Sequence, residues 1–192
     1  MMLNGRAIQS QWKNPNLRDP WLDPSASVQW FDVDYPDVID LRHQLFPEQG
    51  AYHLIGAPLS DLGWLDEVPG ERPGLLIAEG VLHYLGETEV KALLNAVVAR
   101  FPGGQLIFDI CNLMIVKRAG SNVGGTGATY KWGLDDPRDI QKLEPKLELV
   151  KEFRPSELVG FSRFPLWWRA LYRVQELSAT LRRMERTLVY RC

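Results

Sequence analysis

The sequence predicts an α/β fold in which a mainly parallel sheet carries helices on both faces. Two observations indicate this. Short apolar runs alternate with amphipathic segments along the chain, and the run Leu75–Ala78 contains no polar residue, as in a strand covered on both sides. The 192 residues are enough for one domain with a core. We therefore expect an N-terminal arm, residues 1–27, followed by a single domain, residues 28–192.

The first half of the chain gives three predicted strands. The first is Val28–Asp34, and Pro36 after it is well placed to open a helix over Asp37–Leu45. A short strand follows at Tyr52–Gly56. Residues 61–67 are expected to form a turn or helical loop before the third strand, Leu75–Ala78.

The second half contains the clearest helix, Glu87–Phe101. Its apolar residues recur at i, i+3, i+4, i+7 and i+8, namely Val90, Leu93, Leu94, Val97 and Val98. Strands are expected at Gln105–Ile110, Leu147–Phe153 and Thr187–Arg191. Phe164–Glu185 is expected to be mostly helical.

Composition argues against several kinds of partner. A net charge of −2 gives no reason to expect nucleic acid, and no apolar run approaches the roughly 20 residues that cross a bilayer. Cys111 and Cys192 lack metal-ligand spacing, so no metal site is expected and a reducing, cytoplasmic setting fits. The glycine-rich residues 120–127 lack both the P-loop lysine and the G-x-G-x-x-G spacing, which favours a flexible lid or surface loop.

Three acids lie near the carboxyl ends of predicted strands, where open α/β sheets bind ligands. Asp34 ends the first strand, Asp61 lies in the loop after the second, and Glu79 follows the third. Asp34 could accept hydrogen bonds from both hydroxyls of a ribose, or it could cap the helix after it or be a solvated loop acid. Asp61 could instead cap residues 62–65. Glu79 could bind a ligand amine or a cationic ligand, or it could cap residues 80–82.

Other polar residues near these ends have two interpretations each. Asp32 lies on the same strand face as Asp34, so one of the two acids needs a partner if that face is covered. Asp109 is expected to be a structural cap. His83 could act as a base, beside Tyr84, although a packed histidine is the more common arrangement next to an apolar run.

Three stretches together resemble the leucine carboxyl methyltransferase family. They are WFDVDYPDVI with Arg42, which starts at Trp30, then DLGWL at residues 61–65 and AEGVLHYL at residues 78–85. YKWGL at residues 130–134 resembles the polyketide-tailoring branch of that family. The resemblance covers most of the chain from Trp30 onward.

The resemblance implies a Rossmann-like class I methyltransferase fold with one antiparallel strand near the edge of the sheet. It also implies S-adenosyl-L-methionine as cofactor. Asp34 would hold the ribose, Asp61 would lie near the adenine, and Glu79 would lie near the methionine part. Leu59 is a further expected cofactor contact.

The implied activity is O-methyl transfer to a carboxylate or hydroxyl of a small, polyketide-like molecule. A carboxylate acceptor is already charged, so proximity and orientation could supply most of the rate without a base. For a hydroxyl acceptor, His83 is the first candidate base and Tyr84 the second catalytic candidate. Four aromatic residues could line an acceptor pocket, but core packing is the expectation for each: Trp132, Phe164, Trp167 and Trp168.

One departure from the family pattern concerns the start of the domain. Relatives carry a first strand and a glycine-rich loop ahead of the Asp34 unit, whereas residues 1–27 hold a single glycine, Gly5. We therefore expect a sheet without its first strand. A catalytically inactive, methyltransferase-like binding module is the alternative function. A nucleotide-dependent oxidoreductase is a weaker alternative, because the chain has no G-x-G-x-x-G.

Overall fold

A computed structural model of the chain describes residues 29–45, 50–119, 127–157 and 161–192. The chain divides into two compact units, with the boundary between Pro69 and Gly70. The predicted arm, residues 1–27, and most of the predicted glycine-rich loop lie outside the described residues. The expected division into an arm and one domain remains a prediction.

The first unit is a parallel β-α-β arrangement. Strands β1 (Trp30–Asp34) and β2 (Tyr52–Gly56) pair in parallel, and helix α2 (Pro36–Leu45) connects them in sequence and packs on β2. Proline opens this helix as predicted. The 3-10 helix η2 (Leu62–Glu67) follows β2 and buries Trp64. The carboxyl ends of β1 and β2 therefore lie at the same edge of their sheet.

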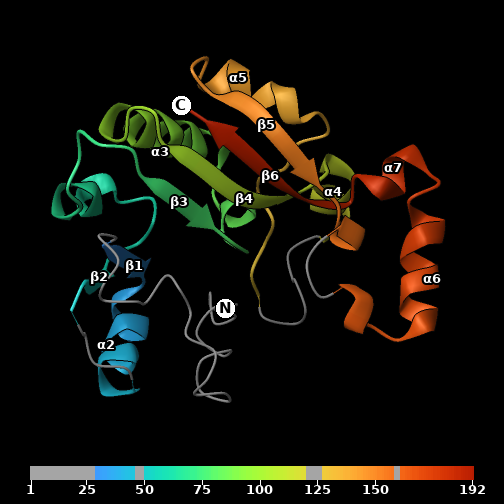
Figure 1. Cartoon of the computed structure of the whole chain (residues 1–192), viewed down its shortest axis with the longest axis horizontal. Helices are drawn as coiled ribbons and strands as arrows, with labels where there is room; N and C mark the ends of the chain where they lie inside the picture. The colour runs from blue at the N-terminus through green and yellow to red at the C-terminus, as the bar shows by residue number, and fades with distance from the viewer. Residues whose placement is uncertain (1–28, 46–49, 120–126, 158–160) are drawn as a thin grey trace. The chain divides into compact units, whose positions relative to one another are not determined.

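The second unit contains a four-stranded sheet (Figure 1). Its order is β3 (Leu75–Ala78), β4 (Gln105–Cys111), β6 (Glu185–Arg191) and β5 (Glu148–Phe153). β3 and β4 are parallel, and β6 is antiparallel to both of its neighbours. One reversed strand thus lies next to the edge, as the family resemblance implied.

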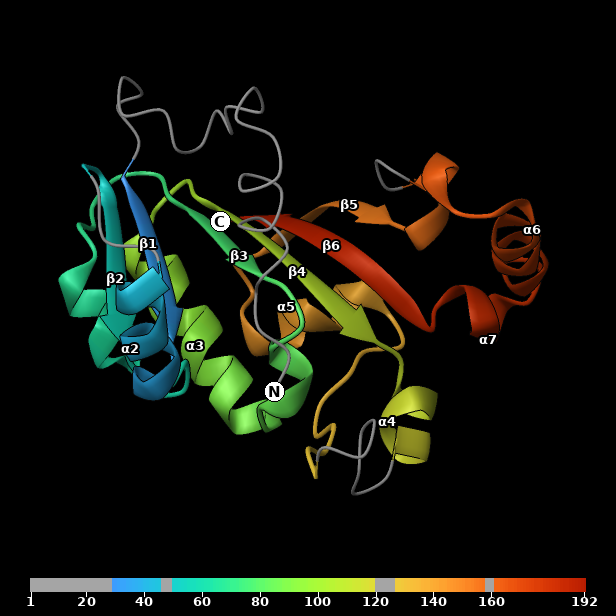
Figure 2. The same ribbon diagram turned by 90° about the horizontal axis from the view of Figure 1, so that it is seen from below.

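The core of this unit lies on one face of the sheet. Helices α3 (Glu87–Arg100) and α5 (Ile140–Leu143) contact each other and lie on the same side of the strands (Figure 2). The five apolar positions that predicted α3 are all buried. Phe108 on β4 stacks on Tyr190 of β6, with ring centroids 5.4 Å apart. Local periodicity therefore predicted the helix that covers this face.

The other face of the sheet is less covered. Leu75 and Ile77 of β3 are 44% and 45% exposed. The apolar run of this strand predicted cover on both faces, and the described residues supply it on one.

The remaining helices are short. They are η3 (Leu82–Tyr84), α4 (Leu113–Ala119), η5 (Pro137–Asp139), η6 (Pro155–Glu157), η7 (Phe161–Arg163), α6 (Leu166–Gln175) and α7 (Ala179–Arg182). The segment Phe164–Glu185, predicted as mostly helical, thus contains the two helices α6 and α7. Strand β6 begins at Glu185 rather than at the predicted Thr187. In the described part of the chain, the helices are too short or too polar to cross a membrane.

The expected core packing holds for Trp132, which is 3% exposed, but is wrong for three other aromatic residues. Phe164, Trp167 and Trp168 are 55%, 63% and 38% exposed. Trp167 and Trp168 belong to α6, and Phe164 lies in the chain just before it. This helix lies beyond the ends of β5 and β6 (Figure 1), away from the faces of the sheet.

Within the described residues, no strand joins the β1–β2 sheet to the four-stranded sheet. A doubly wound sheet with the strand order 3-2-1-4-5 places its first strand between the second and the fourth. In that order, β1 and β2 correspond to strands 2 and 3, and β3 and β4 to strands 4 and 5. The absence of the first strand stays a prediction, because residues 1–28 lie outside the described part of the chain.

Candidate functional site

Asp34 occupies the carboxyl end of β1. Its Oδ1 accepts the backbone N–H of Tyr35 at 2.8 Å, and its side chain is 21% exposed. The first amides of α2 bond the Tyr35 carbonyl instead, so Asp34 is not the helix cap that was its structural alternative. Burial raises the pKa of Asp34 above its usual value, and the Tyr35 hydrogen bond opposes that shift.

Arg42 links the two acids of β1. Its guanidinium pairs with the Asp32 carboxylate and lies 3.8 Å from Asp34 Oδ2. The Tyr52 hydroxyl donates to Asp32 Oδ2 at 2.9 Å. Arg42 is only 7% exposed. The partner that the sequence required for one of these acids is therefore an arginine of the following helix.

Asp61 and Leu59 lie in the loop after β2. Asp61 is exposed and caps η2, because its Oδ1 accepts the N–H of Gly63 at 3.2 Å. The Leu59 carbonyl accepts the indole N–H of Trp64 at 3.3 Å. The structural reading of Asp61 is thus confirmed, and cofactor contacts by Leu59 and Asp61 stay predictions.

Glu79 follows β3 and is exposed. It does not cap residues 80–82, since the N–H of Gly80 donates to Asp109 Oδ1 at 2.6 Å. Gly80 has a φ of 70°, a left-handed conformation that favours glycine. Asp109 is therefore the structural acid here, as predicted. Among the described residues, no hydrogen bond or ion pair engages the Glu79 carboxylate, which leaves it available to a ligand.

His83 and Tyr84 belong to η3, and a third aromatic residue, Tyr130, joins them. The His83 ring lies 4.5 Å from that of Tyr84 and 4.3 Å from that of Tyr130. The His83 carbonyl accepts the backbone N–H groups of Lys131 and Trp132, at 2.7 and 3.2 Å. This pairing brings YKWGL to the end of β3, and that motif was the one sequence signal that could have identified Tyr130.

Burial sets the protonation of this cluster. It lowers the pKa of His83, which is 7% exposed, although the Asp109 charge opposes the shift. It also raises the pKa of the Tyr130 phenol to about 12. At neutral pH the histidine is therefore an uncharged imidazole able to accept a proton, and the phenol keeps its proton.

We expect the His83 imidazole to titrate below 6.5, and this is measurable from its C2–H resonance by NMR. Because the folded pKa is depressed, His83 contributes stability above the unfolded pKa. That stability is lost as the pH falls through the folded pKa. His83→Gln should remove this part of the pH dependence, whereas His43→Gln, on the exposed side of α2, should not. A His83 titration at or above 6.5 would contradict the assignment.

The cysteines do not form a reactive centre. Cys111 is buried, and burial raises the pKa of its thiol to about 11. In the part of the chain that the structure describes, no group of three or more His, Cys, Asp or Glu side chains could hold a metal ion.

The six predicted site residues divide between the two units. Asp34 lies at the carboxyl end of β1, and Leu59 and Asp61 lie beyond that of β2, in the first unit. Glu79, His83 and Tyr84 follow β3 in the second.

Comparison with known sequences finds two relatives, both methyltransferases. The tetracenomycin polyketide synthesis O-methyltransferase TcmP of Streptomyces glaucescens is 37% identical over 134 residues, which are 69% of this chain and 50% of TcmP. The S-adenosyl-L-methionine-dependent methyltransferase dpfgK of Gibberella zeae is 33% identical over 133 residues, 62% of this chain and 45% of dpfgK. The chain thus spans about half the length of the curated relatives it matches. No family model matches it.

Solved structures show the same fold. An S-adenosylmethionine-dependent methyltransferase from Mesorhizobium loti superposes with a TM-score of 0.57 at 14% identity, over 85% of this chain and 80% of that protein. LepI, solved in complex with SAM, gives a TM-score of 0.53 at 13% identity, over 97% of this chain and 39% of LepI. The predicted Rossmann-like methyltransferase fold is confirmed, and at this identity the likeness concerns the fold alone.

Proposed function

We propose that this chain acts in S-adenosyl-L-methionine-dependent O-methyl transfer to a small molecule, as a member of the leucine carboxyl methyltransferase family. The observation that supports the proposal best is the 37% identity to an O-methyltransferase over 134 residues. A polyketide-like acceptor follows from the name of that relative. The free thiols of Cys111 and Cys192 fit a cytoplasmic setting.

The acids at the strand ends fit parts of this cofactor. Asp34 uses one oxygen for the Tyr35 amide, and a carboxylate has further lone pairs for ribose hydroxyls. Burial penalises the charged form of Asp34. A carboxylate perturbed in this way is more typical of a ligand-binding site than of a group that stabilises the fold. Exposed Glu79 could balance the positive charge of the cofactor, and Asp61 keeps one oxygen for the adenine.

The bound cofactor would supply a methyl group activated by a sulfonium. A carboxylate acceptor needs only to be held in line, because its oxygen is already charged. A hydroxyl acceptor must lose a proton, and the neutral imidazole of His83 can accept one. Tyr84 and Tyr130, packed against that ring, would fix its orientation.

Titration with S-adenosylhomocysteine tests the proposal by calorimetry. We expect heat of binding for the unmodified chain, and at least a tenfold weaker affinity for Asp34→Ala, a loss of about 1.4 kcal/mol. Asp40→Ala is the matched control, since Asp40 is an exposed acid on α2 that follows the same strand.

The alternative, a catalytically inactive methyltransferase-like module, predicts that S-adenosylhomocysteine does not bind. Absence of S-adenosylhomocysteine binding at about 1 mM would exclude the active enzyme. A dissociation constant of that size corresponds to a binding free energy of only about 4 kcal/mol. Equal binding by the Asp34→Ala and Asp40→Ala variants would exclude Asp34 as the ribose ligand.

A further inference from the structure

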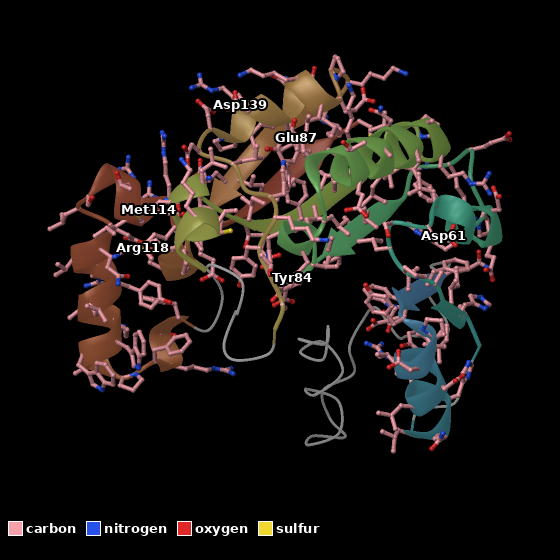
Figure 3. All side chains as sticks on the ribbon, turned by 180° about the vertical axis from the view of Figure 1, so that it is seen from behind. Asp61, Tyr84, Glu87, Met114, Arg118 and Asp139 are labelled. Carbon is pink, nitrogen blue, oxygen red and sulfur yellow. The ribbon has the colours of Figure 1, made fainter. Side chains whose placement is uncertain are left out.

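A hollow of about 510 Å³ lies beyond the carboxyl end of β4, wholly inside the second unit. Its walls come from α4 and the residue before it, from the loop at Asp135, and from the segment around α7. Figure 3 shows two of its residues, Met114 and Arg118, on α4. A volume of this size suits a small molecule, and the carboxyl ends of strands are where open α/β sheets bind ligands.

Three cations line the hollow. Lys117 and Arg118 come from α4, and Arg183 follows α7. All three are exposed, and among the described residues neither Lys117 nor Arg118 has an ion-pair partner. The excess of positive charge is local, because the whole chain has a net charge of −2.

The one acid of the lining, Asp135, is already engaged. Its Oδ1 accepts the N–H of Leu113 at 3.0 Å. Its carbonyl accepts the guanidinium groups of Arg183 and Arg186, at 3.5 and 3.4 Å. One partly engaged carboxylate therefore faces three cations, and the cavity favours an anion.

A helix dipole explains only part of this cluster. Lys117 and Arg118 lie in the last turn of α4, where cations stabilise a helix end. Arg183 belongs to a different segment, and Asn112 fixes that segment against α4. The Asn112 side chain is 2% exposed, donates to the Thr180 carbonyl at 3.1 Å and accepts the Ile115 N–H at 3.0 Å. A buried side chain thus holds the two cationic walls together.

The hollow also has an apolar wall. Leu113 is 41% exposed and Met114 is half-buried beside it. We propose that this cavity binds a small organic anion, whose carboxylate or phosphate pairs with Arg118 and Arg183 and whose apolar body packs on Leu113 and Met114. This site goes beyond the proposed methyl transfer and does not depend on cofactor binding.

Calorimetric titration of the full chain tests the site with three probes that share one ring system: 2-naphthoate, 2-naphthyl phosphate and the uncharged 2-naphthamide. We expect at least one anion to bind at least tenfold more tightly than the amide, and the tighter anion identifies the preferred group. Inorganic phosphate should bind more weakly than naphthyl phosphate, because it lacks the apolar body.

The double variant Arg118→Gln/Arg183→Gln should reduce anion binding to the level of the amide. A matched control is Arg163→Gln/Arg173→Gln, which removes two exposed arginines that do not line the cavity. Both double variants should keep the melting temperature, since all four side chains are exposed. Equal binding of anion and amide, or unchanged anion binding in the cavity variant, would overturn the proposal. S-adenosylhomocysteine binding is measured separately, so failure of one proposal leaves the other standing.

Discussion

Arg186→Ala will lower the free energy of unfolding by about 3–5 kcal/mol, as expected when one partner of a buried charged network is removed. Arg186 is 1% exposed. Its guanidinium donates to the carbonyls of Leu134 and Asp135 and to the Glu152 carboxylate, the last at 3.5 Å. Alanine would leave those carbonyls without this donor, leave Glu152 without its cation and open a cavity in β6. Urea denaturation followed by circular dichroism measures the change.

Arg191→Ala is the control for this prediction, because Arg191 lies on the same strand and is exposed. Its loss should stay within about 0.5 kcal/mol. Arg186→Met keeps most of the side-chain volume but none of the donors, so it should be less destabilising than alanine. If Arg186→Ala cost no more than Arg191→Ala, the buried network would not be what holds β6 to the Leu134–Asp135 segment.

The sequence predicted those helices and strands whose pattern of apolar residues is local. The apolar stripe of α3 and the apolar run of β3 gave these elements within a residue of their observed ends. The aromatic residues of α6 were harder, because their burial depends on a neighbouring surface that no local pattern encodes. Trp167 and Trp168 have the apolar character of core residues and still lie exposed.

The candidate site also has parts that the local sequence predicts and parts that depend on distant contacts. Asp34 and Glu79 could be predicted as candidates because a position at or just after the end of a strand fixes the sheet edge where a side chain lies. Their surroundings depend on contacts between residues distant in sequence, such as the hydrogen bond between Gly80 and Asp109. Tyr130 reaches His83 only because the loop before Trp132 bonds the carbonyl of that histidine.

Arg42→Ala will destabilise the first unit by about 3 kcal/mol or more, because it leaves two part-buried carboxylates without their shared cation. The Asp32 and Asp34 side chains are 16% and 21% exposed, and that of Arg42 is 8% exposed. Arg42→Lys should recover only part of the loss, since an ammonium cannot reach two carboxylates as a guanidinium does. Hydrogen exchange of the β1 and β2 amides measures the stability of this unit directly.

Gln44→Ala is the matched control, because Gln44 is exposed on the same helix, and its effect should stay within about 0.5 kcal/mol. A double-mutant cycle with Asp32→Asn then separates the two acids. If Arg42 acts mainly through Asp32, its removal should cost much less in the Asp32→Asn background. Additive losses would mean that Arg42 acts through other contacts, with Asp34 at 3.8 Å the next candidate. Since Asp34 is the proposed ribose ligand, the cycle also shows whether Arg42 acts mainly by pairing with Asp32 inside the strand or through Asp34 at its end.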